Sequence, residues 1–172
     1  MGLLTPHFWF TSVTQISPAF LRANGITWVA LDKDNTLTPP NVAQCSPQVL
    51  AWLDDLKRSG ITPVLVSNNK RERVQPVAER LGVPFIWRAC KPLASGIRRA
   101  AKLLDRPLGE GAVIGDQLYT DIGAANLAGV KALLVDPLAE DYESFIVFKR
   151  RLEKRHHQKN QHIKQKTLSL LK

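Results

Sequence analysis

The sequence predicts an α/β fold, a three-layer Rossmann-like arrangement in which a five-stranded parallel sheet carries helices on both faces. Three observations favour this class. Short apolar segments alternate along the chain with segments of helical periodicity. The apolar segments are almost uniformly apolar, as expected of parallel strands that are buried on both sides. The chain has 172 residues, of which 44% are apolar, so it can build one globular domain with a substantial core.

Five apolar segments are the predicted strands. The first, ITWVAL at 26–31, is rich in β-branched and aromatic residues and follows the turn residues Asn24 and Gly25. The others are ITPVLV at 61–66, PFIW at 84–87, AVIG at 112–115 and VKALLV at 130–135.

Helices are predicted between these strands. Ser46 and Pro47 favour a helix start, with serine as the capping residue and proline in the first turn, and Gly60 favours its end. One face of this helix is apolar and consists of Val49, Leu50, Leu53 and Leu56. Further helical segments are predicted at 70–81, along Leu93, Ile97, Ala100 and Leu104, and from about Tyr119 to Ala128.

Polar residues follow four of the five strands. The carboxyl ends of parallel strands meet at one edge of the sheet, and ligands bind there, so these residues are expected to form one site. They are Asp32 and Asp34 after the first strand, Ser67, Asn68 and Asn69 after the second, Lys91 after the third, and Asp116 after the fourth, with Asp121 five residues on.

This set of side chains has the chemistry of a phosphate site. Crowded carboxylates repel one another unless a cation lies among them, and all-oxygen ligation favours Mg²⁺. A lysine and a serine hydroxyl can bind the oxygens of a phosphate dianion. One carboxylate can attack phosphorus while a neighbouring carboxyl group donates and then accepts a proton.

Four motifs resemble those of the haloacid dehalogenase (HAD) superfamily of aspartate-nucleophile phosphatases. They are DKDNT, VLVSNN, CKP and GDQLYTD, and the resemblance covers roughly residues 24–136. D-x-D-x-T alone is weak, because aspartates after a strand often only make turns or helix caps. Four motifs in order, each after a predicted strand, favour the family. The resemblance implies a HAD-like fold and an aspartyl-phosphate intermediate.

The resemblance also implies a role for each matched residue. Asp32 is expected to be the nucleophile and Asp34 the general acid and base, with both on the metal, Asp34 through its backbone carbonyl. Thr36 orients this loop, and Lys91 pairs with the nucleophile and the phosphate. Ser67 binds the phosphoryl group with help from Asn68. Asp116 is expected to ligate Mg²⁺, and Asp121 to act on the metal, more indirectly or through water.

The spacing between motifs leaves no room for a cap domain. Thr36 to Ile61 can hold one helix, and Ser67 to Lys91 can hold one helix and one short strand. An open site suits a bulky substrate whose phosphate protrudes. Lys33, the doubled asparagine, CKP and GDQ look like the YqeG-type group in subclass IIIA, which includes phosphatidylglycerophosphate phosphatases. The resemblance therefore implies a phosphorylated glycerolipid substrate and phosphatidylglycerol as the product.

The charge is concentrated at the C-terminal end. Residues 149–172 hold nine of the 24 Lys and Arg and one acid, Glu153, so this segment has a charge of +8 and the remainder +1. The predicted parts are an aromatic N-terminal flank (1–23), the phosphatase domain (24–140) and a basic helix or tail (141–172). The tail favours an anionic membrane surface as partner.

Two flanking features leave alternatives open. HFWF at 7–10 can insert into a membrane or pack on the domain. In the tail, Phe145, Phe148 and Leu152 can form an interfacial helix or dock on the domain. No apolar run of 18 residues or more is present, and a secretory leader is not evident. The expected location is the cytoplasm or an organelle interior, peripheral on the membrane.

Two rival functions remain. One is a soluble phosphatase for sugar phosphates or nucleic-acid ends, with the tail attracting polyanions. Nucleic acid is disfavoured because aromatic and basic residues are not interleaved as in a base-stacking surface. The other is a non-enzymatic adaptor on membrane or RNA, which predicts a lost catalytic residue, whereas every expected position is filled. The oligomeric state is not specified by the sequence.

Overall fold

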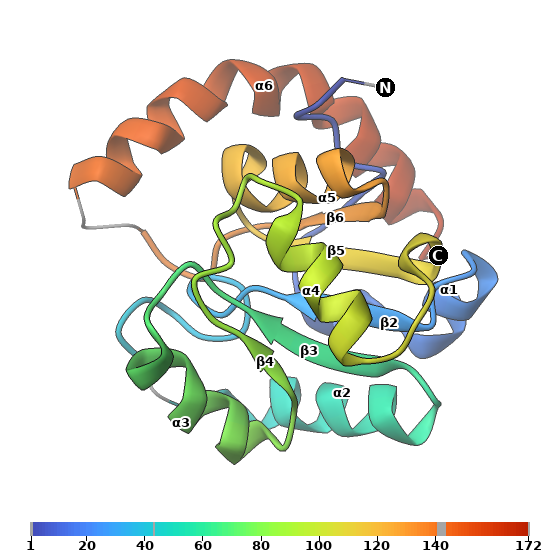
Figure 1. Ribbon diagram of the computed structural model, residues 1–172. Helices are drawn as coiled ribbons and strands as arrows, with labels where there is room; N and C mark the ends of the chain where they lie inside the picture. The colour runs from blue at the N-terminus through green and yellow to red at the C-terminus, as the bar shows by residue number, and fades with distance from the viewer. Residues whose placement is uncertain (1, 43, 141–143, 172) are drawn as a thin grey trace.

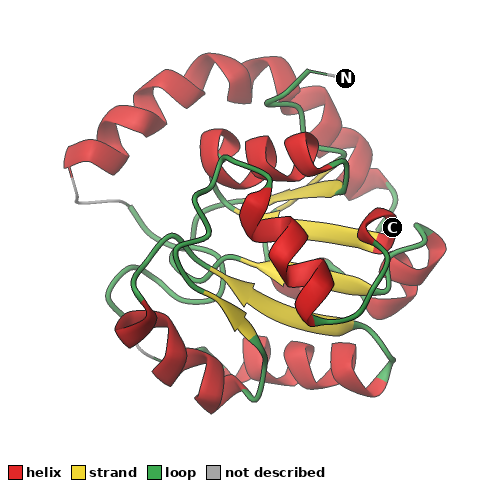
Figure 2. Cartoon of the chain, viewed as in Figure 1, coloured by secondary structure: helices red, strands yellow, loops and turns green. Residues whose placement is uncertain are grey.

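The computed structural model describes residues 2–42, 44–140 and 144–171, and it contains a parallel sheet between two layers of helices (Figures 1 and 2). The predicted α/β class is confirmed, but the sheet has six strands instead of five, in the order β1-β6-β5-β2-β3-β4. The strands are β1 (Phe8–Phe10), β2 (Trp28–Leu31), β3 (Thr62–Val66), β4 (Phe85–Ile86), β5 (Gly111–Gly115) and β6 (Lys131–Val135).

The additional strand is β1, which lies in the N-terminal aromatic segment. Phe8, Trp9 and Phe10 pair in parallel with Leu133, Leu134 and Val135 of β6. Only three residues form this strand, which is too short for a recognisable pattern in the sequence. Trp9 is 3% exposed and Phe10 is fully buried. Membrane insertion by HFWF is therefore wrong, because two of its aromatic rings belong to the core.

Helices cover both faces of the sheet (Figure 2). The core on one face is shared with α1 (Pro18–Ala23), α2 (Pro47–Arg58) and α3 (Arg71–Leu81). The core on the other face is shared with α4 (Ser95–Leu103) and α5 (Gly123–Ala128). Ser46 caps α2 by accepting a hydrogen bond from the Val49 N–H, as predicted. The helix predicted from Tyr119 begins as a π-helical segment, Leu118–Ile122, before α5.

The C-terminal segment forms the long helix α6 (Ser144–Ser169), which covers the free edge of β1 (Figure 1). Its docking side is mainly polar: the side chains of Glu153, Asn160 and Thr167 recur every seventh residue and are buried, and Ile163 alone among the described apolar side chains of α6 packs against the core. The Trp9 N–H donates to Thr167 Oγ1 at 3.1 Å, which satisfies a backbone group of the edge strand. The tail therefore packs on the domain through hydrogen-bonding groups.

The apolar face proposed for the tail does not account for this docking. Leu152 is 49% exposed, and the side chains of Phe145 and Phe148 lie outside the described residues. Across the described residues, none of the helices combines the length and the apolarity needed to span a membrane.

The order of the strands places a site beside β2. The chain moves from the central strand β2 outward to β3 and β4, then returns to the other side of β2 to form β5 and β6. Such a reversal separates the loops that follow β2 and β5 and leaves a crevice at the carboxyl ends of the strands.

Candidate active site

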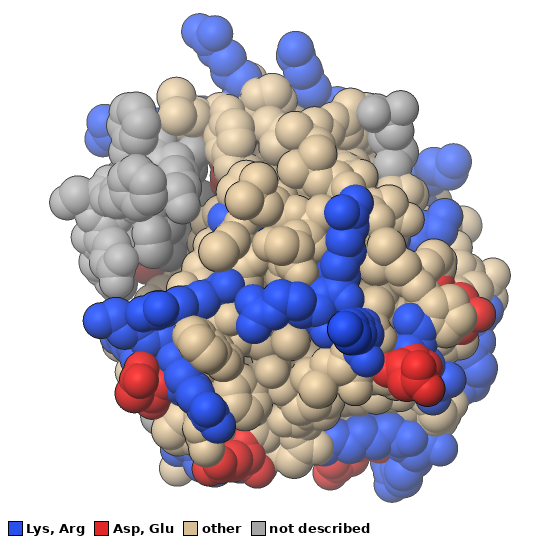
Figure 3. Space-filling view, viewed as in Figure 1, with Lys and Arg blue, Asp and Glu red and all other residues tan. Residues whose placement is uncertain are grey.

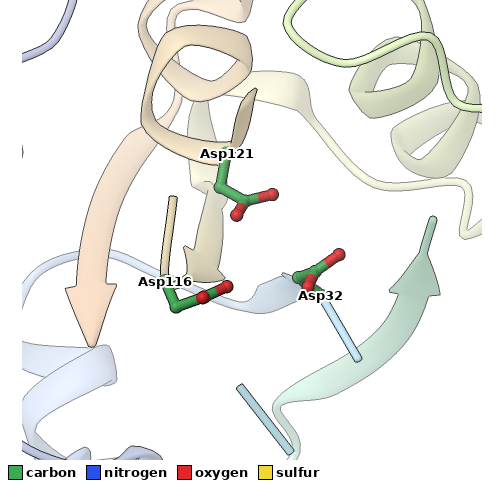
Figure 4. A group of neighbouring side chains, drawn as sticks. All are labelled: Asp32, Asp116 and Asp121. Atoms are coloured by element: carbon green, nitrogen blue, oxygen red, sulfur yellow. The ribbon is translucent and has the colours of Figure 1, made fainter. Parts of the chain in front are cut away.

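The carboxyl ends of the central strands bring the predicted acidic residues together (Figure 4). Asp32 follows β2, Asp116 follows β5, and Asp121 lies in the π-helical segment after β5. One carboxylate oxygen from each of the three lies within 4.8 Å of the others. The figure shows their carboxylates directed toward a common space. Parallel pairing of β2 with β5 creates this cluster from residues more than 80 positions apart.

Lys91 connects two of these acids. Its Nζ donates to Asp32 Oδ1 and to Asp121 Oδ1, each at 2.6 Å. The Lys91 side chain is only 4% exposed. Asn68 holds the lysine backbone, because its side-chain amide donates to the Lys91 carbonyl and accepts from the Lys91 N–H. In this arrangement Asn68, which also lines the cavity, positions Lys91 through both polar atoms of its side chain.

The electrostatics of the pair follow from burial and proximity. Burial raises the pKa of Asp32, an increase that Lys91 opposes and Asp121 reinforces, to about 6 from an ordinary value of 3.8. Burial alone lowers the pKa of Lys91, but the carboxylates of Asp121 and Asp32 outweigh it and raise that pKa above its ordinary value. Lys91 is therefore a permanent positive charge beside the predicted nucleophile.

The acidic cluster fits a magnesium ion. Mg²⁺ prefers oxygen ligands, typically one or two carboxylates together with waters and a substrate phosphate. Asp116 is completely buried, and its Oδ1 accepts a hydrogen bond from Thr36 Oγ1 at 3.2 Å, so Thr36 orients this carboxylate. Both oxygens of Asp121 already accept hydrogen bonds, from Lys91 Nζ and from the Gln117 N–H. Asp32 and Asp116 are thus the direct ligand candidates, with Asp121 behind them.

The side chain of Asp34 lies apart from this cluster. It is 42% exposed, and its Oδ1 pairs with Lys33 Nζ at 2.6 Å. Its Oδ2 accepts a longer hydrogen bond of 3.4 Å from Asn69. Asp34 lines the same cavity as Asp32, as expected of a group that exchanges protons with substrate and water. The geometry leaves its backbone carbonyl as its only predicted contribution to the metal.

Ser67 lies on the opposite wall of the site, at the end of β3. Its side chain is buried and its Oγ accepts a hydrogen bond from the Asn69 N–H at 3.1 Å. The Oγ proton remains available to a phosphoryl oxygen. Ser67, Lys91 and Asp32 all line one cavity of about 440 Å³.

The cavity extends beyond the predicted residues onto α3. Arg73, Val74, Val77 and Arg80 line it together with the predicted site residues. They were not singled out from the sequence, although their three- and four-residue spacing places them along one side of a helix.

The sequence also did not indicate that Glu153 holds a segment of the site in place. This acid of α6 is fully buried, and its Oε1 accepts a hydrogen bond of 2.8 Å from the Tyr119 N–H. Tyr119 belongs to the π-helical segment that carries Asp121. The only acid of residues 149–172 therefore fixes the loop behind the acidic cluster.

The raised pKa of Asp32 predicts a pH-dependent stability cost. The pKa of this carboxyl group is higher in the folded state than in the unfolded state, so the folded state binds more protons. The free energy of unfolding therefore falls as the pH rises from about 4 to about 6. In EDTA, Asp32→Asn should be more stable than wild type by up to about 3 kcal/mol above pH 6 and equal to it near pH 4. Urea unfolding at several pH values measures this gap. A gap that does not change with pH would contradict the prediction.

Gly115 permits the position of Asp121. A Cβ atom at Gly115 would lie 2.4 Å from Asp121 Cγ, far inside contact distance. Gly115→Ala is expected to displace the Asp121 carboxylate, lower the free energy of unfolding by about 1–3 kcal/mol and reduce turnover. Gly109→Ala is the control, because a Cβ there meets no atom within 4 Å. Equal activity and stability in both variants would contradict this packing argument.

The comparisons with known proteins agree with this geometry. Residues 42–129 match the family of haloacid dehalogenase-like hydrolases, and residues 2–79 match the mitochondrial PGP phosphatase family. The chain is 33% identical over 150 residues to the probable phosphatase YqeG of Bacillus subtilis (strain 168), with 87% of each protein covered. It is 27% identical to the chloroplastic phosphatidylglycerophosphate phosphatase 1 of Chlamydomonas reinhardtii, covering 88% of this chain and 60% of that longer protein.

Solved structures share the fold. NagD from Escherichia coli K-12 superposes with a TM-score of 0.55 at 15% identity, covering 67% of this chain and 90% of that one. The 3-deoxy-D-manno-octulosonate 8-phosphate phosphatase from Moraxella catarrhalis, solved with magnesium and phosphate ions, gives a TM-score of 0.53 at 25% identity. The match covers 67% of this chain and 71% of that one.

Proposed function

The chain belongs to the haloacid dehalogenase-like hydrolases and is a phosphatase of the YqeG and phosphatidylglycerophosphate phosphatase type, and we propose that it hydrolyses the terminal phosphate of phosphatidylglycerophosphate. The proposed reaction is Mg²⁺-dependent and passes through an aspartyl-phosphate. The observation that carries the chemistry is Lys91, buried between the predicted nucleophile Asp32 and Asp121 at 2.6 Å from each.

The first proposed step transfers the phosphoryl group to the enzyme. A carboxylate oxygen of Asp32 attacks phosphorus, the bond from phosphorus to the leaving oxygen breaks, and that oxygen takes a proton from the Asp34 carboxyl group. Lys91 and the Ser67 hydroxyl bind phosphoryl oxygens during transfer. The ammonium group already contacts Asp32 Oδ1, so little reorganisation is needed when charge moves from Asp32 to the phosphoryl group.

The second proposed step releases phosphate. Asp34, now ionised, takes a proton from water, and the water oxygen attacks phosphorus of the aspartyl-phosphate. Inorganic phosphate leaves and the Asp32 carboxylate is restored. Mg²⁺ held by Asp32, Asp116 and the Asp34 carbonyl would neutralise charge on the transferred phosphoryl group.

The proposal of a lipid substrate is based on the activity named for two relatives and on the size of the cavity. Two curated relatives are phosphatidylglycerophosphate phosphatases, at 27% and 26% identity. The test is phosphate release from phosphatidylglycerophosphate in mixed micelles with Mg²⁺, compared with soluble phosphomonoesters. Fast release that prefers the lipid supports the proposal. Cleavage of soluble esters alone would overturn the lipid assignment and leave the phosphatase chemistry in place.

We also propose that α6 holds the enzyme on an anionic bilayer. Its docked side is polar, while Arg151, Lys154, Arg155 and Lys159 are exposed. Figure 3 shows that Lys and Arg also form a band across the face that is viewed. Buried acids such as Asp116 and Asp121 leave the surface more basic than the composition suggests. A basic surface attracts anionic lipids by about 1 kcal/mol per Lys or Arg.

Charge removal on α6 tests this surface without disturbing its docked side. The triple variant Lys154→Gln, Arg155→Gln, Lys159→Gln should bind anionic vesicles on the order of 100-fold more weakly than wild type. The control removes the same charge elsewhere, from the exposed side chains of Arg98, Lys102 and Arg106. Vesicle sedimentation at low and high salt measures both. Equal losses in the two triple variants would show that net charge, and not α6, controls binding.

A further inference from the structure

The cavity that contains Asp32 has a second basic wall. Arg73 and Arg80, on α3, line the cavity with the catalytic side chains, and Val74 and Val77 lie between them. The cavity volume of about 440 Å³ exceeds what a phosphate ion alone requires. The remaining space can hold the part of the substrate that stays after phosphate leaves.

The spacing of the two arginines places them along one side of α3. They are seven residues apart with Val77 in between, which corresponds to two helical turns and about 10 Å along the axis. Arg80 Nε donates to the Pro76 carbonyl at 3.1 Å, which directs its guanidinium group along the helix. Val77, which lies between the two arginines in the sequence, also lines the cavity. This wall thus combines two positive charges with a short apolar surface.

These arginines have no acidic partner within the described part of the chain. The salt bridges of the cavity join Asp32 with Lys91 and Asp34 with Lys33, and neither of the two arginines lies within 4 Å of a described carboxylate. Guanidinium groups bind phosphate oxygens through paired hydrogen bonds. An uncompensated pair of arginines in a phosphatase cavity therefore indicates a second anionic group in the substrate.

We propose that Arg73 and Arg80 form a subsite for a second anion, the phosphodiester that remains on the substrate when its terminal phosphate is removed. The inference rests on the proposed function and deepens it. Phosphatidylglycerophosphate carries a phosphomonoester and a phosphodiester joined by a three-carbon glycerol. With the monoester at Asp32, the diester extends along α3. A simple sugar phosphate has only the first anion and cannot use this wall.

The experiment compares substrates with two anions and with one. Short-chain soluble phosphatidylglycerophosphate removes membrane binding from the measurement, and p-nitrophenyl phosphate carries one anionic group. In the double variant Arg73→Gln, Arg80→Gln, kcat/KM for the lipid relative to p-nitrophenyl phosphate should fall about 10- to 100-fold, mainly through KM. Arg71→Gln is the control, because Arg71 lies on the same helix, bonds Gln75 and does not line the cavity.

The outcomes separate the two proposals. An unchanged ratio in the double variant, or an equal fall in Arg71→Gln, would overturn the subsite. If wild type does not cleave the lipid, the proposed function fails. The subsite is then judged by short-chain phosphatidylglycerol, which has only the phosphodiester, as a competitive inhibitor of p-nitrophenyl phosphate cleavage. Weaker inhibition of the double variant supports the subsite, and equal or absent inhibition overturns it.

Discussion

Asp32→Asn is expected to abolish turnover, with kcat falling on the order of 10⁴-fold or more while the fold is retained. An amide cannot attack phosphorus as a carboxylate does, so the aspartyl-phosphate cannot form. The substitution preserves the shape of a side chain that is 13% exposed, and it removes a charge whose burial is costly. Phosphate release with Mg²⁺ and acid-stable labelling of the protein by radioactive phosphate measure the loss.

The matched control is Asp55→Asn. Asp55 lies on α2, and its side chain is 52% exposed beside Arg58. This control should keep wild-type activity and labelling. Appreciable Mg²⁺-dependent turnover by Asp32→Asn, with its circular dichroism unchanged, would mean that another group is the nucleophile.

Lys91→Met is expected to have the second largest effect, on both activity and stability. The Lys91 side chain is 4% exposed and its ammonium group lies between two carboxylates, so its removal leaves Asp32 and Asp121 buried beside each other without a cation. The free energy of unfolding in EDTA should fall by about 3 kcal/mol near neutral pH. Turnover should fall about 10²- to 10³-fold, because the phosphoryl oxygens lose a preorganised positive charge.

Two further measurements identify the cause. Lys102→Met, on the exposed side of α4, removes the same charge and should change neither quantity. Lowering the pH toward 5 should narrow the stability gap of Lys91→Met, because protonated carboxyl groups do not need the ammonium group. If the difference in the free energy of unfolding between wild type and Lys91→Met persists at low pH, the lost stability comes from packing. If the turnover of Lys91→Met stays within threefold of wild type, Lys91 is not a catalytic residue.

The elements that the sequence predicted well share a cause. The runs at 61–66 and 130–135 became β3 and β6 within one residue, since strands buried on both faces must be apolar throughout. The family was predicted correctly because its four motifs follow strands in order, and the phosphatase class is confirmed by the relatives. The roles of the individual site residues remain predictions that the variants above test.

Other features depend on partners that are distant in the sequence. β1 is a strand because β6 provides its hydrogen bonds. The three residues FWF show no alternation of apolar and polar side chains, so the sequence alone does not predict this pairing. The docked side of α6 is formed by Glu153, Asn160 and Thr167, whose partners are backbone groups near the N-terminus and after β5. Hydropathy cannot identify such a polar interface, and it favoured an apolar face instead.

The sequence by itself determined the fold class and the family, and it predicted which side chains belong to the site. Those properties are local, since each motif is a short strand followed by its polar loop. Tertiary structure alone decided which of these groups touch: Lys91 bridges Asp32 and Asp121, Asn68 holds Lys91, and Arg73 and Arg80 share the cavity. Strand order and helix packing set these distances, and both arise from contacts between residues far apart in the chain.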